Sequence, residues 1–75
     1  MKQPLNNINP AKLKHSKWTA VKPVNKEKHF IVSRVKYDDD GDVTLCELEA
    51  VLTKRLESID WRSLKDCSHW IQGWQ

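Results

Sequence analysis

The pair Asp40-Gly41 constrains this chain more than any other feature, because it lies between two stretches with the composition of β-strands. A two-residue type I′ turn needs a positive φ at both central positions, and Asp-Gly is among the pairs that best meet this requirement. Residues 28–37, which precede the pair, are rich in β-branched side chains. The sequence therefore predicts a β-hairpin with its tip at residues 40 and 41.

The register of this hairpin follows from the predicted turn. If Asp40 and Gly41 form the loop, Asp39 faces Asp42, and Arg34 then lies opposite Glu47 as a cross-strand ion pair. Side chains alternate along a strand, so the same register collects apolar residues on the other face. The predicted pairs on that face are Ile31 with Ala50, Ser33 with Leu48, Val35 with Cys46, and Tyr37 with Thr44.

Two other segments are predicted to be strands. Residues 16–22 contain aromatic and β-branched residues and stop at Pro23, which favours an edge strand. Residues 43–54 are predicted as the third strand, because the Asp-Gly turn needs a partner for the strand before it. A helix over residues 44–59 is the open alternative, since its leucines fall at helical spacing behind a capping-box pattern.

The C-terminal part predicts a helical segment over residues 60–72. Its apolar residues recur at steps of three and four, behind Ser58 or Asp60 as a cap and ahead of Gly73 as a C-cap. The predicted fold class is therefore α+β, with a three-stranded antiparallel β-meander packed by a C-terminal helical segment. We expect Trp18 and Trp61 in its core.

Residues 1–9 are predicted to be a flexible arm, and residues 10–75 a single tryptophan-rich domain. The arm has little to bury and ends at Asn9, a possible cap for a turn that starts at Pro10. A chain of 75 residues supports one core, and its four tryptophans supply large apolar areas. With no apolar signal segment and only two cysteines, we expect a cytoplasmic protein with reduced thiols.

Catalytic and metal-binding patterns are weak, so we expect no enzyme, no cofactor and no metal. Two glycines are too few for a phosphate-binding loop, and the acidic run 38–42 departs from a calcium loop because Val43 stands where glycine is required. The cysteines and histidines lack zinc spacing. A cleft that joins Asp60, Asp66 or Glu47 to a histidine would reopen the question of catalysis.

Charge is distributed unevenly, although the formal net charge is only +3. Residues 1–36 hold nine of the thirteen lysines and arginines and one of the ten acidic residues. One interpretation is a basic edge that binds an anionic partner, with RNA or single-stranded DNA expected. The alternative is that the basic and acidic halves neutralise each other in the fold. The candidate basic residues are Lys12, Lys14, Lys17, Lys22, Lys26 and Lys28.

A second functional hypothesis uses the C-terminal tryptophans. Trp70 and Trp74 are expected nearer the surface than the other two, and an exposed aromatic patch with a polar rim is typical of protein-interaction sites. This hypothesis predicts a protein-protein interaction adaptor. Neither hypothesis involves a membrane or a small-molecule substrate.

Several motifs together resemble a known family. They are residues 16–21 (SKWTAV), 25–30 (NKEKHF), 47–55 (ELEAVLTKR), 61–66 (WRSLKD) and 70–74 (WIQGW). In this order they resemble the small bacterial tryptophan-rich proteins catalogued as a domain of unknown function, over about residues 9–75. The resemblance implies a stand-alone bacterial cytoplasmic protein, and it implies no activity, catalytic residue or ligand residue.

Overall fold

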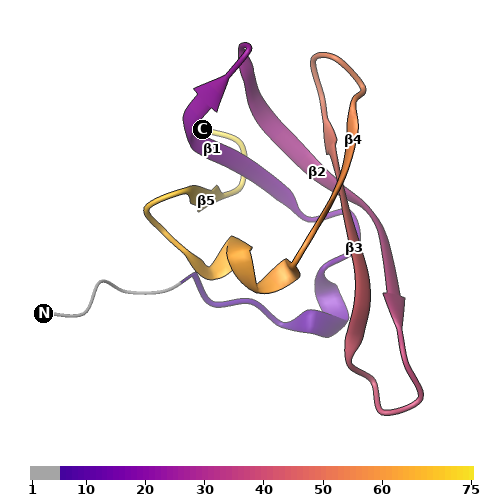
Figure 1. The fold of residues 1–75 in the computed structure, drawn as a ribbon. Coiled ribbons are helices and arrows are strands. Elements are labelled where there is room, and N and C mark those ends of the chain that lie inside the picture. The colour runs from indigo at the N-terminus through magenta and orange to yellow at the C-terminus, as the bar shows by residue number, and fades with distance from the viewer. Residues whose placement is uncertain (1–5) are drawn as a thin grey trace, which may run out of the picture.

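The computed structural model describes residues 6–75, which form one five-stranded antiparallel β-sheet (Figure 1). The strands are β1 (Lys17–Val24), β2 (Glu27–Tyr37), β3 (Val43–Ala50), β4 (Leu56–Ile59) and β5 (Trp70–Gln72), with 3-10 turns η1 (Pro10–Lys12) and η2 (Trp61–Lys65). Their order in the sheet is β4-β3-β2-β1-β5. The first four strands form a meander, and β5 returns to pair with β1.

The predicted α+β class is wrong, because the described part of the chain is all-β. Asp60 does begin a helical turn by accepting the amide of Arg62, but η2 ends after Lys65. The rest of the predicted helix 60–72 contains β5, whose Trp70 pairs with Ala20 of β1. The exposed edge of β1 offers backbone groups that need partners, and this distant pairing prevails over the local helical spacing.

The third and first predicted strands also differ from the structure. The predicted strand 43–54 ends at Ala50, and after a turn in which Lys54 has a φ of 64° the chain returns as β4. The helical alternative for residues 44–59 is therefore wrong as well. β1 is not an edge strand, since it lies between β2 and β5, and it continues through Pro23, where its pairing with β2 is irregular.

The hairpin between β2 and β3 is present, but its tip has three residues instead of two. The amide of Asp38 donates to the carbonyl of Asp42 at 2.9 Å, and only Gly41, with a φ of 84°, has a positive φ in the loop. The carboxylate of Asp38 accepts the amides of Asp40 and Asp42. Asp40 is thereby spared the positive φ that the predicted type I′ turn would impose on it.

The predicted register is confirmed only in the middle of the hairpin. Arg34 lies opposite Glu47 and Val35 opposite Cys46, but the register shifts between Val32 and Arg34 and again between Lys36 and Tyr37. An unpaired residue in one strand is a β-bulge, and it reverses the side to which the following side chains point. The extra residues are Ser33 in β2 and Thr44 in β3.

These bulges overturn the three other predicted pairs. Ala50 faces Phe30 instead of Ile31, Leu48 faces Val32 instead of Ser33, and Tyr37 faces Val43 instead of Thr44. Among residues 6–75, Arg34 and Glu47 form no ion pair, and a carboxylate oxygen of Glu47 instead accepts the hydroxyl of Ser33 at 3.3 Å.

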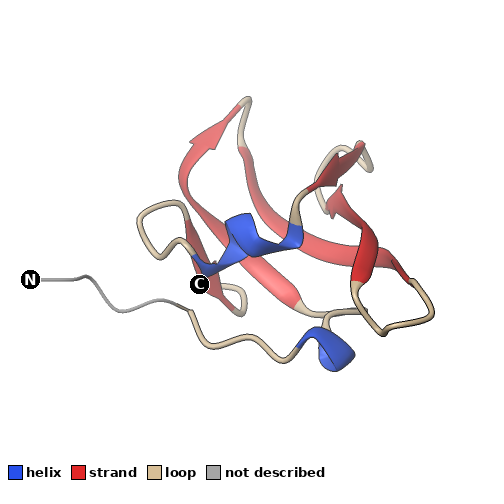
Figure 2. Ribbon diagram, turned by 60° about the horizontal axis from the view of Figure 1, so that its bottom comes forward, coloured by secondary structure: helices blue, strands red, loops and turns tan. Residues whose placement is uncertain are grey.

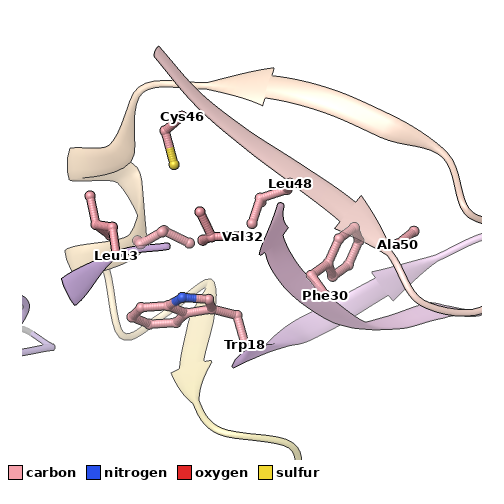
Figure 3. Close-up of a cluster of buried hydrophobic side chains, with 8 residues drawn as sticks. Leu13, Trp18, Phe30, Val32, Cys46, Leu48 and Ala50 are labelled. Atoms are coloured by element: carbon pink, nitrogen blue, oxygen red, sulfur yellow. The ribbon is translucent and has the colours of Figure 1, made fainter. Parts of the chain in front are cut away.

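The core lies on the concave side of the sheet, and η2 crosses that side (Figure 2). Its buried side chains are Leu13, Trp18, Phe30, Val32, Cys46, Leu48, Ala50 and Leu64, most of them labelled in Figure 3. Trp18 is only 2% exposed, and its indole N–H donates to the hydroxyl of Ser16 at 2.9 Å. The largest side chain of the core is therefore buried with its polar group satisfied.

Residues that precede β1 also pack against the sheet. The predicted cap is confirmed, because the side chain of Asn9 accepts the amide of Ala11 at the start of η1. The side-chain amide of Asn6 donates to the carbonyls of Leu64 and Trp70 at 2.8 Å. Residues 1–5 of the predicted arm lie outside the described residues. No helix within residues 6–75 is long and apolar enough to cross a membrane.

Candidate functional site

A pocket of about 570 Å³ opens at the end of the concave face where the β1–β2 and β3–β4 turns lie, at the top of Figure 1. Its apolar lining comes from Ala20, Val24, Phe30 and Trp70. The rings of Phe30 and Trp70 meet edge to face, with their centroids 5.2 Å apart. The volume lies within the range typical of sites for small ligands.

An ion pair between a buried carboxylate and a half-exposed arginine forms one wall of this pocket. Glu27 is 6% exposed, and its carboxylate accepts bonds from Nε and Nη2 of Arg55 at 2.8 to 3.1 Å and a further bond from Thr53. The hydrogen bonds from Arg55 and then from Thr53 lower the pKa of Glu27. The pair joins the β3–β4 turn to the start of β2, so it fixes the two turns relative to each other.

Asp66 and His69 line the opposite wall. Asp66 accepts the hydroxyl and the amide of Ser68, and one of its oxygens lies 2.8 Å from Nδ1 of His69. The bonds from Ser68, and then the bond from His69, lower the pKa of Asp66 to about 2. Aspartate and histidine are thus joined in a cleft, the arrangement that would reopen the question of catalysis.

The arrangement around His69 differs from that of a catalytic triad. Both Asp66 and Ser68 contact the same nitrogen, Nδ1, and within residues 6–75 no side chain bonds to Nε2. In a catalytic triad the acid and the nucleophile occupy different nitrogens of the imidazole. The pair instead fastens the loop before β5, in which Asp66 also accepts the amide of Trp70.

A second feature lies on the opposite, convex face. Gly73, with a φ of 80°, turns the chain after β5 so that residues 74 and 75 lie over β1 and β2. Trp74 donates its indole N–H to the carbonyl of Phe30 at 3.0 Å, and its ring centroid lies 4.7 Å from Nζ of Lys17. The ring of His29 is 5.9 Å away. Trp74 remains 43% exposed, so this aromatic group is accessible.

The sequence-predicted site residues do not gather on one surface. All six candidate lysines are exposed, but Lys22 lines the pocket while Lys17 lies beside Trp74 on the convex face. Lys12 and Lys14 lie in and just after η1. The two aromatic candidates are also separated by the sheet, because Trp70 lines the pocket.

The sequence reasoning missed the two charged clusters that shape the pocket. Glu27 is the single acidic residue in the basic half, and this isolation was a signal that it pairs with a basic residue, which the structure shows to be Arg55. His69 follows Asp66 by three residues, a spacing that favours contact.

The acidic hairpin tip is the one group within residues 6–75 whose ligand atoms could hold a metal ion. Carboxylate oxygens of Asp38, Asp40 and Asp42 lie within 4.8 Å of one another, and all three residues are exposed. Asp38 is already engaged with the loop amides, which accounts for its position in the fold.

Comparison with known proteins places the chain in a family. Residues 16–75 match the family model described as "Tryptophan-rich protein (DUF2389)", a family of unknown function. Comparison with curated proteins and with solved structures gave no match. The matched region begins just before β1 and includes all five strands, most of the residues that line the pocket, and Trp74. The chain therefore belongs to the DUF2389 family of tryptophan-rich proteins.

Proposed function

We propose that this protein is a non-enzymatic binding module that contacts a flexible polyanion, single-stranded RNA or DNA, along the β1–β2 hairpin. The observation that carries the proposal is the exposed ring of Trp74 with Nζ of Lys17 4.7 Å from its centroid. Proteins bind single strands by combining lysines that follow the phosphates with aromatic rings that stack on bases.

Uncompensated charge supports this proposal. The ion pairs of residues 6–75 involve Lys54, Arg55, Arg62 and His69, so none of the six candidate lysines is neutralised. Within residues 6–75 one ion pair joins the two halves of the chain, and it pairs Glu27, the single acidic residue of the basic half, with Arg55 of the acidic half. The basic half therefore keeps its excess charge at the surface, where it attracts a polyanion.

The geometry around Trp74 supplies the aromatic component. Its indole N–H is bonded to the backbone of β2, so the ring is held against the sheet. A ring fixed in this way loses little conformational entropy when a base stacks on it. Stacking of this kind contributes ~1–3 kcal/mol per base.

A titration with oligo(dT) and oligo(rU), followed by tryptophan fluorescence, tests the proposal. We expect log K to fall with log salt concentration by about 0.7 for each neutralised phosphate, and Lys17→Gln to reduce the slope by about this amount. Trp74→Leu should remove most of the fluorescence change.

The chain offers a matched control. Lys65 also lies over a tryptophan, with Nζ 4.8 Å from the ring centroid of Trp61, but this pair lies in η2. Lys65→Gln should therefore leave the salt slope unchanged. Binding without salt dependence, or equal losses in Lys17→Gln and Lys65→Gln, would contradict the proposal.

A protein-interaction adaptor is the second candidate, favoured by apolar side chains on the convex face. Val21 and Ile71, on β1 and β5, are 39% and 40% exposed, and both strands lie beside the residues that Trp74 contacts. A pull-down with the wild-type chain and Trp74→Ala in parallel tests this candidate. A nuclease-resistant partner retained by the wild type alone would favour it, whereas identical profiles for both chains would count against it.

A further inference from the structure

We propose that the pocket between the two hairpin turns is a separate site for a small organic anion with an apolar body, such as an arylalkanoate. This inference goes beyond the proposed polyanion contact and does not rest on it, because the two sites lie on opposite faces of the sheet. The argument starts from the floor of the pocket, where the edge-to-face pair of Phe30 and Trp70 provides an apolar surface. An apolar body of roughly drug-fragment size gains from burial against such a surface.

The carboxylates that line the pocket already form hydrogen bonds or ion pairs within the protein. The carboxylate of Glu27 accepts bonds from Arg55 and Thr53, and Glu57 accepts Nη1 of Arg55 at 3.3 Å. Asp66 accepts bonds from Ser68 and lies beside Nδ1 of His69. Each carboxylate that lines the pocket thus already has a cationic or polar partner within the protein, with Arg55 shared between Glu27 and Glu57.

Two of the groups that line the pocket without a partner are donors. Within residues 6–75, Nζ of Lys22 forms no ion pair or hydrogen bond, and the indole N–H of Trp70 has no acceptor. In Arg55, Nη1 donates one hydrogen bond to Glu57 and Nη2 donates one to Glu27. Each of these nitrogens carries a second hydrogen that can bond to a ligand. Lys22 and Trp70 therefore offer free donors to the pocket, and an anionic group on the ligand supplies an acceptor for them.

The register of the sheet brings these donors to the apolar floor. Ala20 of β1 faces Trp70 of β5, and Lys22 is the next residue of β1 on the same side. Alternate residues of a strand are about 7 Å apart. A ligand whose ring lies over Phe30 and Trp70 can therefore place an anionic group, two or three bonds from the ring, against Lys22.

Three probes of one shape test the charge preference: 3-phenylpropionate, 3-phenylpropanamide and 3-phenylpropylamine, titrated into the full-length ¹⁵N-labelled chain. We expect the propionate to bind most tightly and to shift the indole N–H signal of Trp70, with the signal of buried Trp18 unchanged. Lys22→Gln should weaken propionate binding about threefold to tenfold and leave amide binding unchanged.

Two further variants separate this site from the convex face. Lys28→Gln, a change at an exposed lysine of β2 outside the pocket lining, should leave propionate binding unchanged, and so should Lys17→Gln. Trp70→Phe keeps an aromatic floor and removes the N–H donor, so it should weaken the propionate more than the amide.

Three results would overturn the proposal. They are tighter binding of the amine than of the propionate, equal loss of propionate binding in Lys22→Gln and Lys28→Gln, or no change in the pocket signals with any of the three probes. The oligonucleotide titration reports on Lys17 and Trp74, so failure of one proposal is distinguishable from failure of the other.

Discussion

The two ends of the concave face lie on the same β-sheet but differ in the side chains that pack against it. At the η1 end, Leu13 from outside the strands packs with Trp18, Val32 and Cys46 (Figure 3), and Leu64 of η2 belongs to the same buried cluster. At the turn end, Phe30 and Trp70 line a pocket, and charged residues such as Glu27, Arg55 and Asp66 form much of its wall. We call these regions the filled end and the open end.

The difference indicates that one end of a short sheet can supply most of the folding stability while the other end keeps an accessible pocket. A chain of 75 residues buries little surface, so the filled end must supply most of the hydrophobic stabilisation. The open end holds its shape with hydrogen-bonded charges, which contribute less when they are half-exposed and which leave a pocket accessible. Substitutions should therefore affect folding at the filled end and binding at the open end.

The largest expected effect is that of Trp18→Ala at the filled end. Removing a tryptophan that is 2% exposed should lower the free energy of unfolding by about 3–5 kcal/mol, a large part of the total for a small domain. Urea denaturation followed by circular dichroism measures this loss. The same change at Trp74, which is 43% exposed, should cost less, about 1–2 kcal/mol, because the burial of part of its ring and its hydrogen bond to Phe30 are lost. Equal losses would break the distinction between core and surface tryptophans.

The next effect concerns the thiol of Cys46, measured in a Cys67→Ser background. Burial, and then the negative charge of Asp60, raise the pKa of Cys46 to about 11. At pH 8 such a thiol is ionised ~100-fold less than an ordinary cysteine, so its reaction with an aromatic disulfide reagent should be slower by at least that factor. A rate in native buffer equal to that in urea would show that the filled end opens readily.

The smallest effect is expected for Glu27→Gln at the open end. The lowered pKa of Glu27 means that its ionised form stabilises the fold above the pKa of the unfolded state, about 4.3, and that this contribution is lost as pH falls through the folded pKa. Wild type should therefore be more stable than the variant at pH 7, and the difference should shrink below pH 4. Thermal melts at both pH values test this, and a constant difference would contradict the assignment.

Local patterns predicted the parts of the fold that depend on neighbouring residues. The hairpin around Gly41 and the cap at Asn9 follow from turn and cap chemistry, and both are present. β5 could not be found in this way, because its three residues are a strand only through pairing with β1, some fifty residues earlier. The helical spacing of Trp61 and Leu64 reflects only the short turn η2.

The sequence predicted which residue types the candidate site uses, but not on which face of the sheet each residue lies. Lysines and C-terminal tryptophans were identified as binding residues, and Lys17 does lie beside Trp74. The sequence could not show that Lys22 and Trp70 face the other side, since that follows from the register of β1 with β5. Nor did it reveal the pair of Glu27 and Arg55, which are joined only when the two turns meet.

The bulges at Ser33 and Thr44 change which residues of β2 and β3 face the core. Side chains of a strand alternate between its two faces, and each extra residue shifts this alternation by one position. In β2, even-numbered residues face the core before the bulge at Ser33, and odd-numbered residues face it after the bulge. Phe30 and Val35 can therefore serve the same face, although they are five residues apart. Loss of Ser33 would join Val32 directly to Arg34, opposite Leu48 and Glu47, so both parts of the hairpin would keep their present sides toward the core and only the bulge would disappear.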